Sequence, residues 1–250
     1  MKKLLSLLAV LLLCGTALAD PLPLGDELCG VACWPDGTDE ATASYVYRYS
    51  YPTAAGDDDV SLMINEFYTY TVEDALTFTV PINGESLADE EGPCSTTITS
   101  TVTCNNDDFF SVLMVKESRF GDIVYTIYSA HTFGRIGAKA GSVVSLPYLL
   151  GLLENEATDE WLETRQTAKA DECVRRMIWE IIEEQMDDGT VAYYDDLDYE
   201  TLTELFYPEE DYYLDADGDP VFFLEEGMAA DRSEGVLLFP FTLEELLDEI

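Results

Sequence analysis

The fold is decided by residues 94–133, CSTTITSTVTCNNDDFFSVLMVKESRFGDIVYTIYSAHTF. Three runs rich in β-branched and aromatic residues, at about 95–104, 109–117 and 122–133, are separated by short polar turns at 105–108 and 118–121. Connections this short join antiparallel neighbours, so we expect a three-stranded meander. The middle run is apolar on both faces, which is typical of a central strand that is covered on both sides.

Further elements flank the meander. Upstream, residues 20–42 are rich in Pro, Gly and Asp, which predicts an irregular arm. The alternation in residues 43–51 predicts a strand with Tyr45, Tyr47, Tyr49 and Tyr51 on one face, and the spacing of apolar residues in 59–77 predicts a helix. Downstream, we expect helices at 147–153, 168–186, 199–206 and 243–250, a hairpin of 212–214 with 221–224, and a strand at 236–239. Runs of strands with helices laid over them predict an α+β fold, an antiparallel sheet meander with helices packed on it in a single compact domain.

The N-terminus has the pattern of a secretory signal peptide over residues 1–19. Lys2 and Lys3 precede an apolar run from Leu4 to Leu13, and Ala17-Leu18-Ala19 matches the site that signal peptidase reads. That run is about half of the ~20 residues that a membrane-spanning helix needs, and no later run approaches that length. We therefore expect a secreted or cell-surface protein on the exterior of a bacterial envelope, with no membrane span after cleavage. An uncleaved anchor and lipoprotein processing at Cys14 are the alternatives.

The charge is strongly negative. The chain has 51 acidic residues against 12 lysines and arginines, a formal net charge of −39, and signal cleavage would remove two of the lysines. Such a surface excludes nucleic acid as a partner, because phosphates demand basic surfaces. It favours cationic partners and speeds their encounter, although solubility alone would also explain it.

Five cysteines follow the signal peptide. Cys94 and Cys104 cannot bond each other across one extended strand, because ten steps of ~3.3 Å separate them by far more than a disulfide spans. Each could instead pair with one of Cys29 and Cys33 and so clamp the N-terminal arm. Buried free thiols are the alternative, and Cys173 lies on an apolar helical stripe.

No catalytic, cofactor or metal site is evident in the sequence. His131 is the single histidine and is expected to be a structural hydrogen-bonding residue, and the common hydrolase and phosphate-binding motifs are absent. The run Asp215–Glu226 resembles a calcium loop, but Pro220 occupies the position that needs glycine, so we favour a hairpin turn. The zinc-knuckle spacing is also missing.

The most suggestive surface lies between residues 193 and 213, where tyrosines alternate with acids. Tyrosine beside carboxylate suits recognition of an Arg/Lys-rich protein surface, while an acidic solvated connection with core aromatics is the alternative. We take the candidate partner-binding residues to be Tyr193, Tyr194, Asp195, Asp196, Tyr199, Tyr207, Asp211 and Tyr212.

These elements together resemble the extracellular domain family shared by RsiV-type anti-sigma factors and PdaC-type peptidoglycan deacetylases. The clearer match is C-terminal: Asp211-Tyr-Tyr-Leu214, Asp217-Gly218, Val221-Phe-Phe-Leu224, Ala229-Ala230 to Gly235, and Leu238-Phe239-Pro240 with Leu243 to Leu246. Upstream, Tyr51-Pro52, Ile64-Asn65, Ser129-Ala130-His131 and Gly141 through Leu150 follow the family's order. Departures are Ser129 for a glycine, Ser142 for a lysine, and a missing aromatic-proline pair near Gly227.

The resemblance divides the chain into a PdaC-like half, 43–146, and an RsiV-like half, 147–250, and implies an α+β fold with a binding role. In RsiV-like relatives the ligand is lysozyme, a basic protein. We therefore expect a secreted or surface binding module without enzymatic activity, with a cationic lysozyme-like protein as partner. The alternatives are a small hydrolase of cell-wall polymer and a structural surface protein without a ligand.

Overall fold

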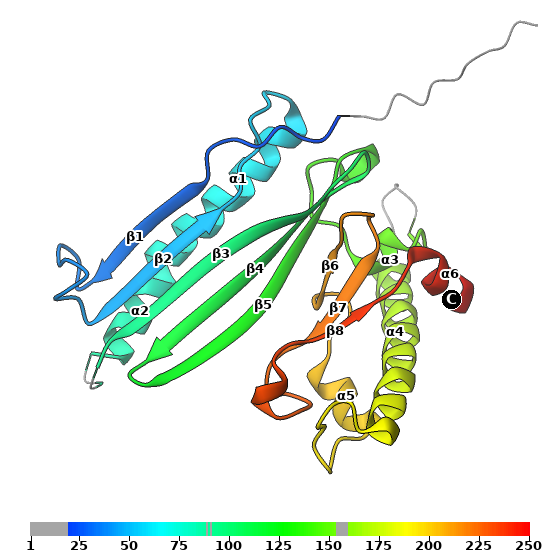
Figure 1. Cartoon of the computed structure of the whole chain (residues 1–250). Coiled ribbons are helices and arrows are strands. Elements are labelled where there is room, and N and C mark those ends of the chain that lie inside the picture. The colour runs from blue at the N-terminus through cyan, green and yellow to red at the C-terminus, as the bar shows by residue number, and fades with distance from the viewer. Residues whose placement is uncertain (1–19, 89, 91, 154–159) are drawn as a thin grey trace, which may run out of the picture.

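The computed structural model describes residues 20–88, 90, 92–153 and 160–250. The expected signal peptide lies outside these residues. Two sheets organise the chain, a five-stranded sheet in the N-terminal half and a three-stranded sheet in the C-terminal half, each with helices against it (Figure 1). The fold is thus α+β, as predicted. No helix within the described ranges is long and apolar enough to cross a membrane.

The five-stranded sheet has the order β1-β2-β3-β4-β5. Its strands are β1 Leu28–Trp34, β2 Tyr45–Tyr51, β3 Cys94–Asn105, β4 Phe109–Phe120 and β5 Ile123–Gly134. The meander β3-β4-β5 is antiparallel, as its short turns predict. Two expectations were wrong: the arm 20–42 contains strand β1, and β2 pairs with β3 in parallel, so the sheet is not wholly antiparallel.

The parallel pair arises because the chain crosses the sheet in a helical connection between β2 and β3. This connection consists of α1 Asp59–Asp74, a π-helical turn Ala75–Thr79 and α2 Val80–Ser86. Asp58 caps the start of α1, accepting a hydrogen bond from the Ser61 backbone N–H at 3.0 Å. The helical connection continues beyond residue 77, where the sequence predicts that the helix ends, because the Val80 N–H bonds the Ala75 carbonyl in a wider π turn. The connection returns the chain to the end of the sheet where β2 began.

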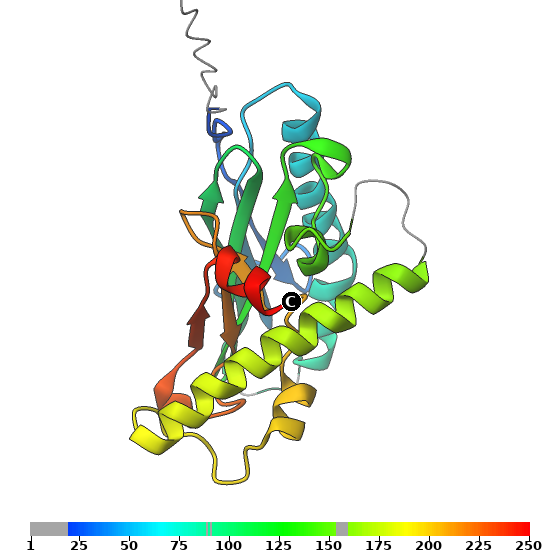
Figure 2. The same cartoon turned by 90° about the vertical axis from the view of Figure 1, so that its right-hand side faces the viewer.

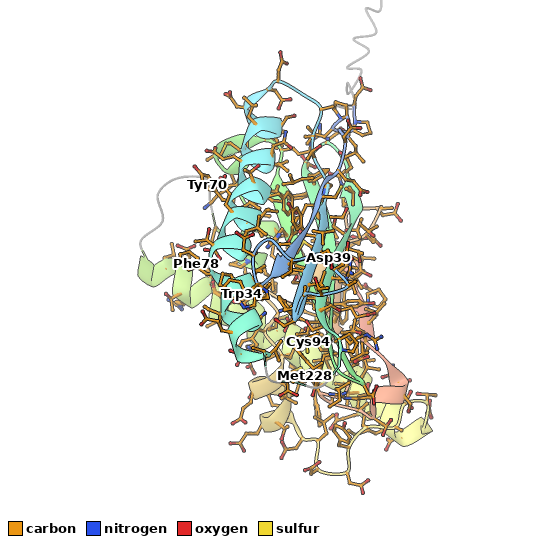
Figure 3. All side chains as sticks on the ribbon, turned by 90° about the vertical axis from the view of Figure 1, so that its left-hand side faces the viewer. Trp34, Asp39, Tyr70, Phe78, Cys94 and Met228 are labelled. Carbon is orange, nitrogen blue, oxygen red and sulfur yellow. The ribbon has the colours of Figure 1, made fainter. Side chains whose placement is uncertain are left out.

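Tyrosines of β2 form the core beneath these helices. Tyr45 and Tyr51 are almost fully buried, and Tyr51 stacks on Tyr68 of α1 with ring centroids 5.1 Å apart. Trp34 of β1 points toward α2 (Figure 3), where an added Cβ on Gly84 would lie 2.1 Å from its ring. Glycine at this position therefore lets α2 pack directly on the indole.

The C-terminal half is built on a long helix and a small antiparallel sheet. The helices are α3 Leu146–Leu149, α4 Glu160–Asp188, α5 Tyr199–Leu205 and α6 Leu243–Glu249, and the strands are β6 Tyr212–Leu214, β7 Pro220–Leu224 and β8 Leu237–Pro240. Short 3₁₀ turns lie at Gly137–Lys139 and Arg232–Glu234. Helix α4 runs obliquely across this half (Figure 2), and its fully buried side chains recur every four residues: Ala170, Val174, Ile178 and Ile182.

The C-terminal half packs on the face of the large sheet opposite α1. The Leu214 N–H donates to the buried Ser111 hydroxyl at 3.0 Å, and Phe223 contacts the ring of Tyr128. Side chains along β4 and β5 alternate between the two faces of the sheet. Ser111 and Tyr128 face the C-terminal half, whereas Val112 and His131 face α1. Strand β4 is therefore covered on both faces at its beginning, as its two apolar faces predict.

All five described cysteines are free thiols. The expected bridges between the arm and β3 are not formed, because β2 lies between the two strands and separates them by ~10 Å, whereas a disulfide needs Cα atoms within ~6.8 Å. Cys104 also leaves the face predicted for it. A bulge after Val102 reverses the alternation, so Cys104 pairs with Ser111 and joins the C-terminal core.

The acidic run after β6 forms the expected hairpin turn. The Asp215 carboxylate accepts hydrogen bonds from the backbone N–H groups of Asp217 and Asp219, at 2.9 and 3.0 Å. Gly218 has a φ of +89°, which glycine adopts without strain. Within the described ranges, no group of three or more histidine, cysteine, aspartate or glutamate side chains is placed to hold a metal ion.

Candidate functional site

The structure does not bring the eight predicted partner-binding residues together. Tyr212 is only 4% exposed and belongs to the core, where its hydroxyl donates to the Val144 carbonyl. That part of the prediction was wrong, because alternation along β6 turns Tyr212 and Leu214 inward together. Tyr193 is half-buried, its hydroxyl bonds Gln185 at 2.5 Å, and burial raises its pKa to about 12.

The six remaining predicted residues lie in three separate places. Tyr194, Asp195 and Asp196 are exposed beyond the C-terminal end of the helix. Tyr199 lies nearer its middle, where its hydroxyl donates to Glu172 at 3.1 Å and its ring meets Trp179 edge-on. Tyr207 and Asp211 belong to a separate turn.

That turn, Tyr207–Asp211, is held by reciprocal hydrogen bonds. The Asp211 carboxylate accepts from the Tyr207 N–H at 2.8 Å, and the Asp211 N–H donates to the Tyr207 carbonyl at the same distance. The turn is anchored to α4 where Arg175 Nε donates to the Phe206 carbonyl at 3.1 Å. It thus presents the exposed side chain of Glu209 over the helix.

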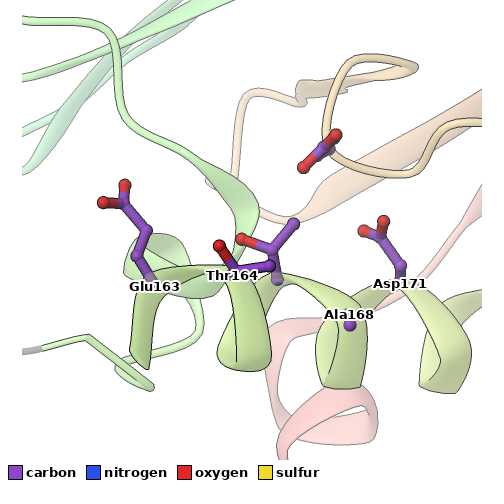
Figure 4. Close-up of a pocket in the computed structure, with 6 residues that line it drawn as sticks. Glu163, Thr164, Ala168 and Asp171 are labelled. Carbon is purple, nitrogen blue, oxygen red and sulfur yellow. The ribbon is translucent and has the colours of Figure 1, made fainter. Parts of the chain in front are cut away.

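Between the turn and α4 lies a cleft of about 460 Å³, which we call the acidic cleft (Figure 4). Its lining consists of Glu163, Thr164, Thr167, Ala168 and Asp171 from α4 and Glu209 from the turn. Glu163, Thr167 and Asp171 are spaced by four residues and therefore share one side of the helix. Among the described residues, three carboxylates and no basic side chain line the cleft, so this lining gives it a negative potential.

Asp171 is the unusual member of this lining. It is 7% exposed, and its Oδ1 has no hydrogen-bond partner in the part of the chain that the structure describes. Its Oδ2 lies 3.7 Å from Arg175 Nη2, which is too long for a hydrogen bond. Arg175 is held away by its bond to the Phe206 carbonyl. A buried carboxylate with an unused acceptor is costly, so this feature points to a donor that comes from outside the chain.

Burial raises the pKa of two carboxyl groups in this region. Burial, with repulsion from Glu209, raises the pKa of Asp171 to about 6 against the opposing attraction of Arg175. Burial also raises the pKa of Asp211 to about 6, although its bond from the Tyr207 N–H opposes the change. At neutral pH both groups are mainly ionised, and both gain protons in mildly acidic solution.

His131 forms no catalytic arrangement. It packs edge-on against Phe67, with 4.7 Å between the ring centroids, and beside Phe133. Its Nδ1 has no hydrogen-bond partner among the residues that the structure describes. The expected structural role therefore rests on aromatic packing and not on a bond from Nδ1. Burial lowers its pKa to about 4, so the ring is neutral at pH 7.

A second surface feature is apolar. The outer side of α1 and the π turn exposes Tyr70 and Phe78, at 61% and 57% (Figure 3). Beside Tyr70, a shallow hollow is lined by Met63, Phe67 and Val143 with Glu66 at its edge. The acidic cleft differs from this surface in that a buried group with an unused bonding capacity, Asp171, is itself part of its lining.

Sequence reasoning missed Asp171. The only signal was an acid next to the apolar stripe of α4, between Ala170 and Cys173. The predicted residues Tyr207 and Asp211 lie at the two ends of the turn that contributes Glu209 to the cleft.

No protein-family model and no curated protein matches the chain. A solved structure of a DUF3298 family protein from Pseudomonas aeruginosa PAO1 resembles it with a TM-score of 0.55 at 13% identity, over 92% of this chain and 94% of that chain. A DUF3298 family member from Bacteroides fragilis gives a TM-score of 0.49 at 14% identity, over 91% of this chain and 94% of its own. The structural neighbours are thus DUF3298 proteins, and the likeness to the Pseudomonas protein is one of fold.

Proposed function

We propose that the chain is a non-enzymatic binding module that acts outside the cytoplasm and captures a cationic protein. The observation that carries this proposal is the acidic cleft, in which Asp171 is buried with an unsatisfied acceptor and lies close to Glu209. A cationic side chain would supply the missing donor and neutralise the local charge.

Two further features support the proposal. The formal net charge of −39 attracts basic proteins over a distance set by the ionic strength. The resemblance to the RsiV and PdaC extracellular domains suggests a lysozyme-like protein as the partner. Export, which rests on the pattern of residues 1–19, would place the module where such proteins occur.

The test is titration of the purified protein, without residues 1–19, against a basic lysozyme and against a second basic protein of similar net charge. Calorimetry at ~0.15 M salt and again at ~0.5 M salt separates specific capture from general attraction, because exposed charges are screened within a few ångströms at high salt. We expect a saturable complex with lysozyme that survives high salt. Equal, salt-sensitive binding of both proteins, or release of soluble fragments from cell-wall polymer, would contradict the proposal.

A further inference from the structure

We propose that the acidic cleft is an arginine pocket, in which one guanidinium group of the captured protein binds between Asp171 and Glu209. The inference rests on the proposed function, since it names the chemical group through which capture occurs. It starts from Asp171, which lines the cleft and whose buried Oδ1 has no donor among the described residues. Figure 4 shows the Asp171 and Glu163 carboxylates rising from the same side of α4.

The occupant must be a cation with hydrogen-bond donors. The three ionisable side chains in the described part of the lining are all acidic, so an anion is repelled. A metal ion is disfavoured, because no three suitable side chains converge among the described residues. The cleft, at about 460 Å³, is also far larger than an ion and has room for a long side chain.

Arg175 does not fulfil this role itself. Its Nε is bonded to the Phe206 carbonyl, which keeps its nearest nitrogen 3.7 Å from the Asp171 carboxylate. Arg175 is also absent from the cleft lining, so the cleft side of Asp171 stays unneutralised. Arg175 therefore lies beside the Asp171 carboxylate without donating a hydrogen bond to it.

The shape of the lining favours arginine over lysine. Asp171 is deep and comes from α4, whereas Glu209 is exposed and comes from the turn. A guanidinium carries five N–H donors in a planar fork and can bond both carboxylates at once. A lysine ammonium is a compact and strongly hydrated charge that gives up more water to reach a buried acceptor. The methyl groups of Ala168 and Thr167 can contact the aliphatic stem of the ligand.

The experiment uses blocked amino acids, so it does not require the partner protein. N-acetyl-arginine amide, the matching lysine amide and the uncharged citrulline amide are titrated into isotopically labelled protein, and backbone amide shifts are followed by NMR. We expect the arginine probe to bind with a dissociation constant on the order of millimolar, the lysine probe to bind several-fold more weakly, and citrulline not to bind.

Variants locate the binding. Asp171→Asn and Glu209→Gln are expected to weaken the arginine probe by about tenfold or more. Glu183→Gln is the matched control: it removes one charge from an exposed position of the same helix, roughly 18 Å further along, and should change binding less than twofold. Circular dichroism and unfolding curves confirm that each variant is folded.

The outcomes separate this inference from the proposed function. Arginine-probe binding that Asp171→Asn abolishes, without capture of any basic protein, supports the pocket and contradicts the proposed function. Capture of a basic protein that both cleft variants leave unchanged overturns the pocket and leaves the proposed function standing. Equal affinity for the arginine and lysine probes, or equal losses in Glu183→Gln, also overturns it.

Discussion

Replacing Asp171 with asparagine should stabilise the protein at neutral pH. Folding raises the pKa of this carboxyl from 3.8 to about 6, chiefly through burial. A group whose pKa rises on folding stabilises the protein while it is protonated, and that stability is lost as the pH increases through the folded value. Asparagine has the same shape and cannot ionise, so it escapes this loss.

The magnitude follows from the two pKa values. At 1.36 kcal/mol for each tenfold change in the ionisation constant, the change from 3.8 to about 6 corresponds to about 3 kcal/mol at pH 7 and above, and to roughly half of that at pH 5. The attraction of Arg175 is already contained in the folded pKa, so it needs no separate subtraction. We therefore expect Asp171→Asn to raise the free energy of unfolding by about 3 kcal/mol at pH 7.

Urea unfolding followed by circular dichroism at pH 5, 6, 7 and 8 measures this difference. The advantage of Asp171→Asn should grow between pH 5 and 7 and level off above that, while Glu183→Gln should stay within ~0.5 kcal/mol of the wild type throughout. A variant less stable than the wild type at pH 7 would refute the reasoning. So would an advantage that is independent of pH, because ionisation could not then be its cause.

Three further predictions use the same preparations. Binding of the arginine probe should weaken about tenfold for each pH unit below 6 as Asp171 gains its proton, which NMR titrations at pH 5 and 7 measure; affinity that does not change would contradict this. Burial lowers the pKa of His131 to about 4, so protonation of this ring should lower the free energy of unfolding of the wild type by about 3 kcal/mol as the pH falls from 6.5 to 4. Urea unfolding curves of His131→Phe should lack this loss. A maleimide should label exposed Cys29 in the native protein and buried Cys104 only after unfolding; fewer than five reactive thiols in unreduced, unfolded protein would indicate a disulfide.

Most of the secondary structure could be predicted because strong local patterns specify it. The strands of the meander and the stripe on α4 appear within a few residues of their expected places. Strand β1 was missed because its sequence, LCGVACW, is short and lies between Pro- and Gly-rich segments. The parallel pairing of β2 with β3 depends on where a helical connection returns the chain, which no local pattern records.

The site was harder to predict than the fold. A single extra residue after Val102 moved Cys104 to the opposite face, and alternation alone gives no sign of such a bulge. Asp171 gives no sign of its role in the sequence, where it is one of 51 acids. Asp171 is distinguished by its neighbour Arg175, which donates to the Phe206 carbonyl, 31 residues further along the chain, and not to the Asp171 carboxylate. Only the tertiary structure reveals this bond.

The cost of Asp171 is itself an argument about the cleft. An ionised carboxylate with a free acceptor destabilises the folded protein at neutral pH, and the neighbouring Glu209 increases that penalty. Asparagine would remove most of the penalty without changing the shape of the helix. A cation bound in the cleft would remove it as well, by returning the pKa of Asp171 toward its ordinary value. The free energy lost in the unbound fold is thus recovered on binding, so a group that weakens the isolated protein strengthens its complex with a cationic partner.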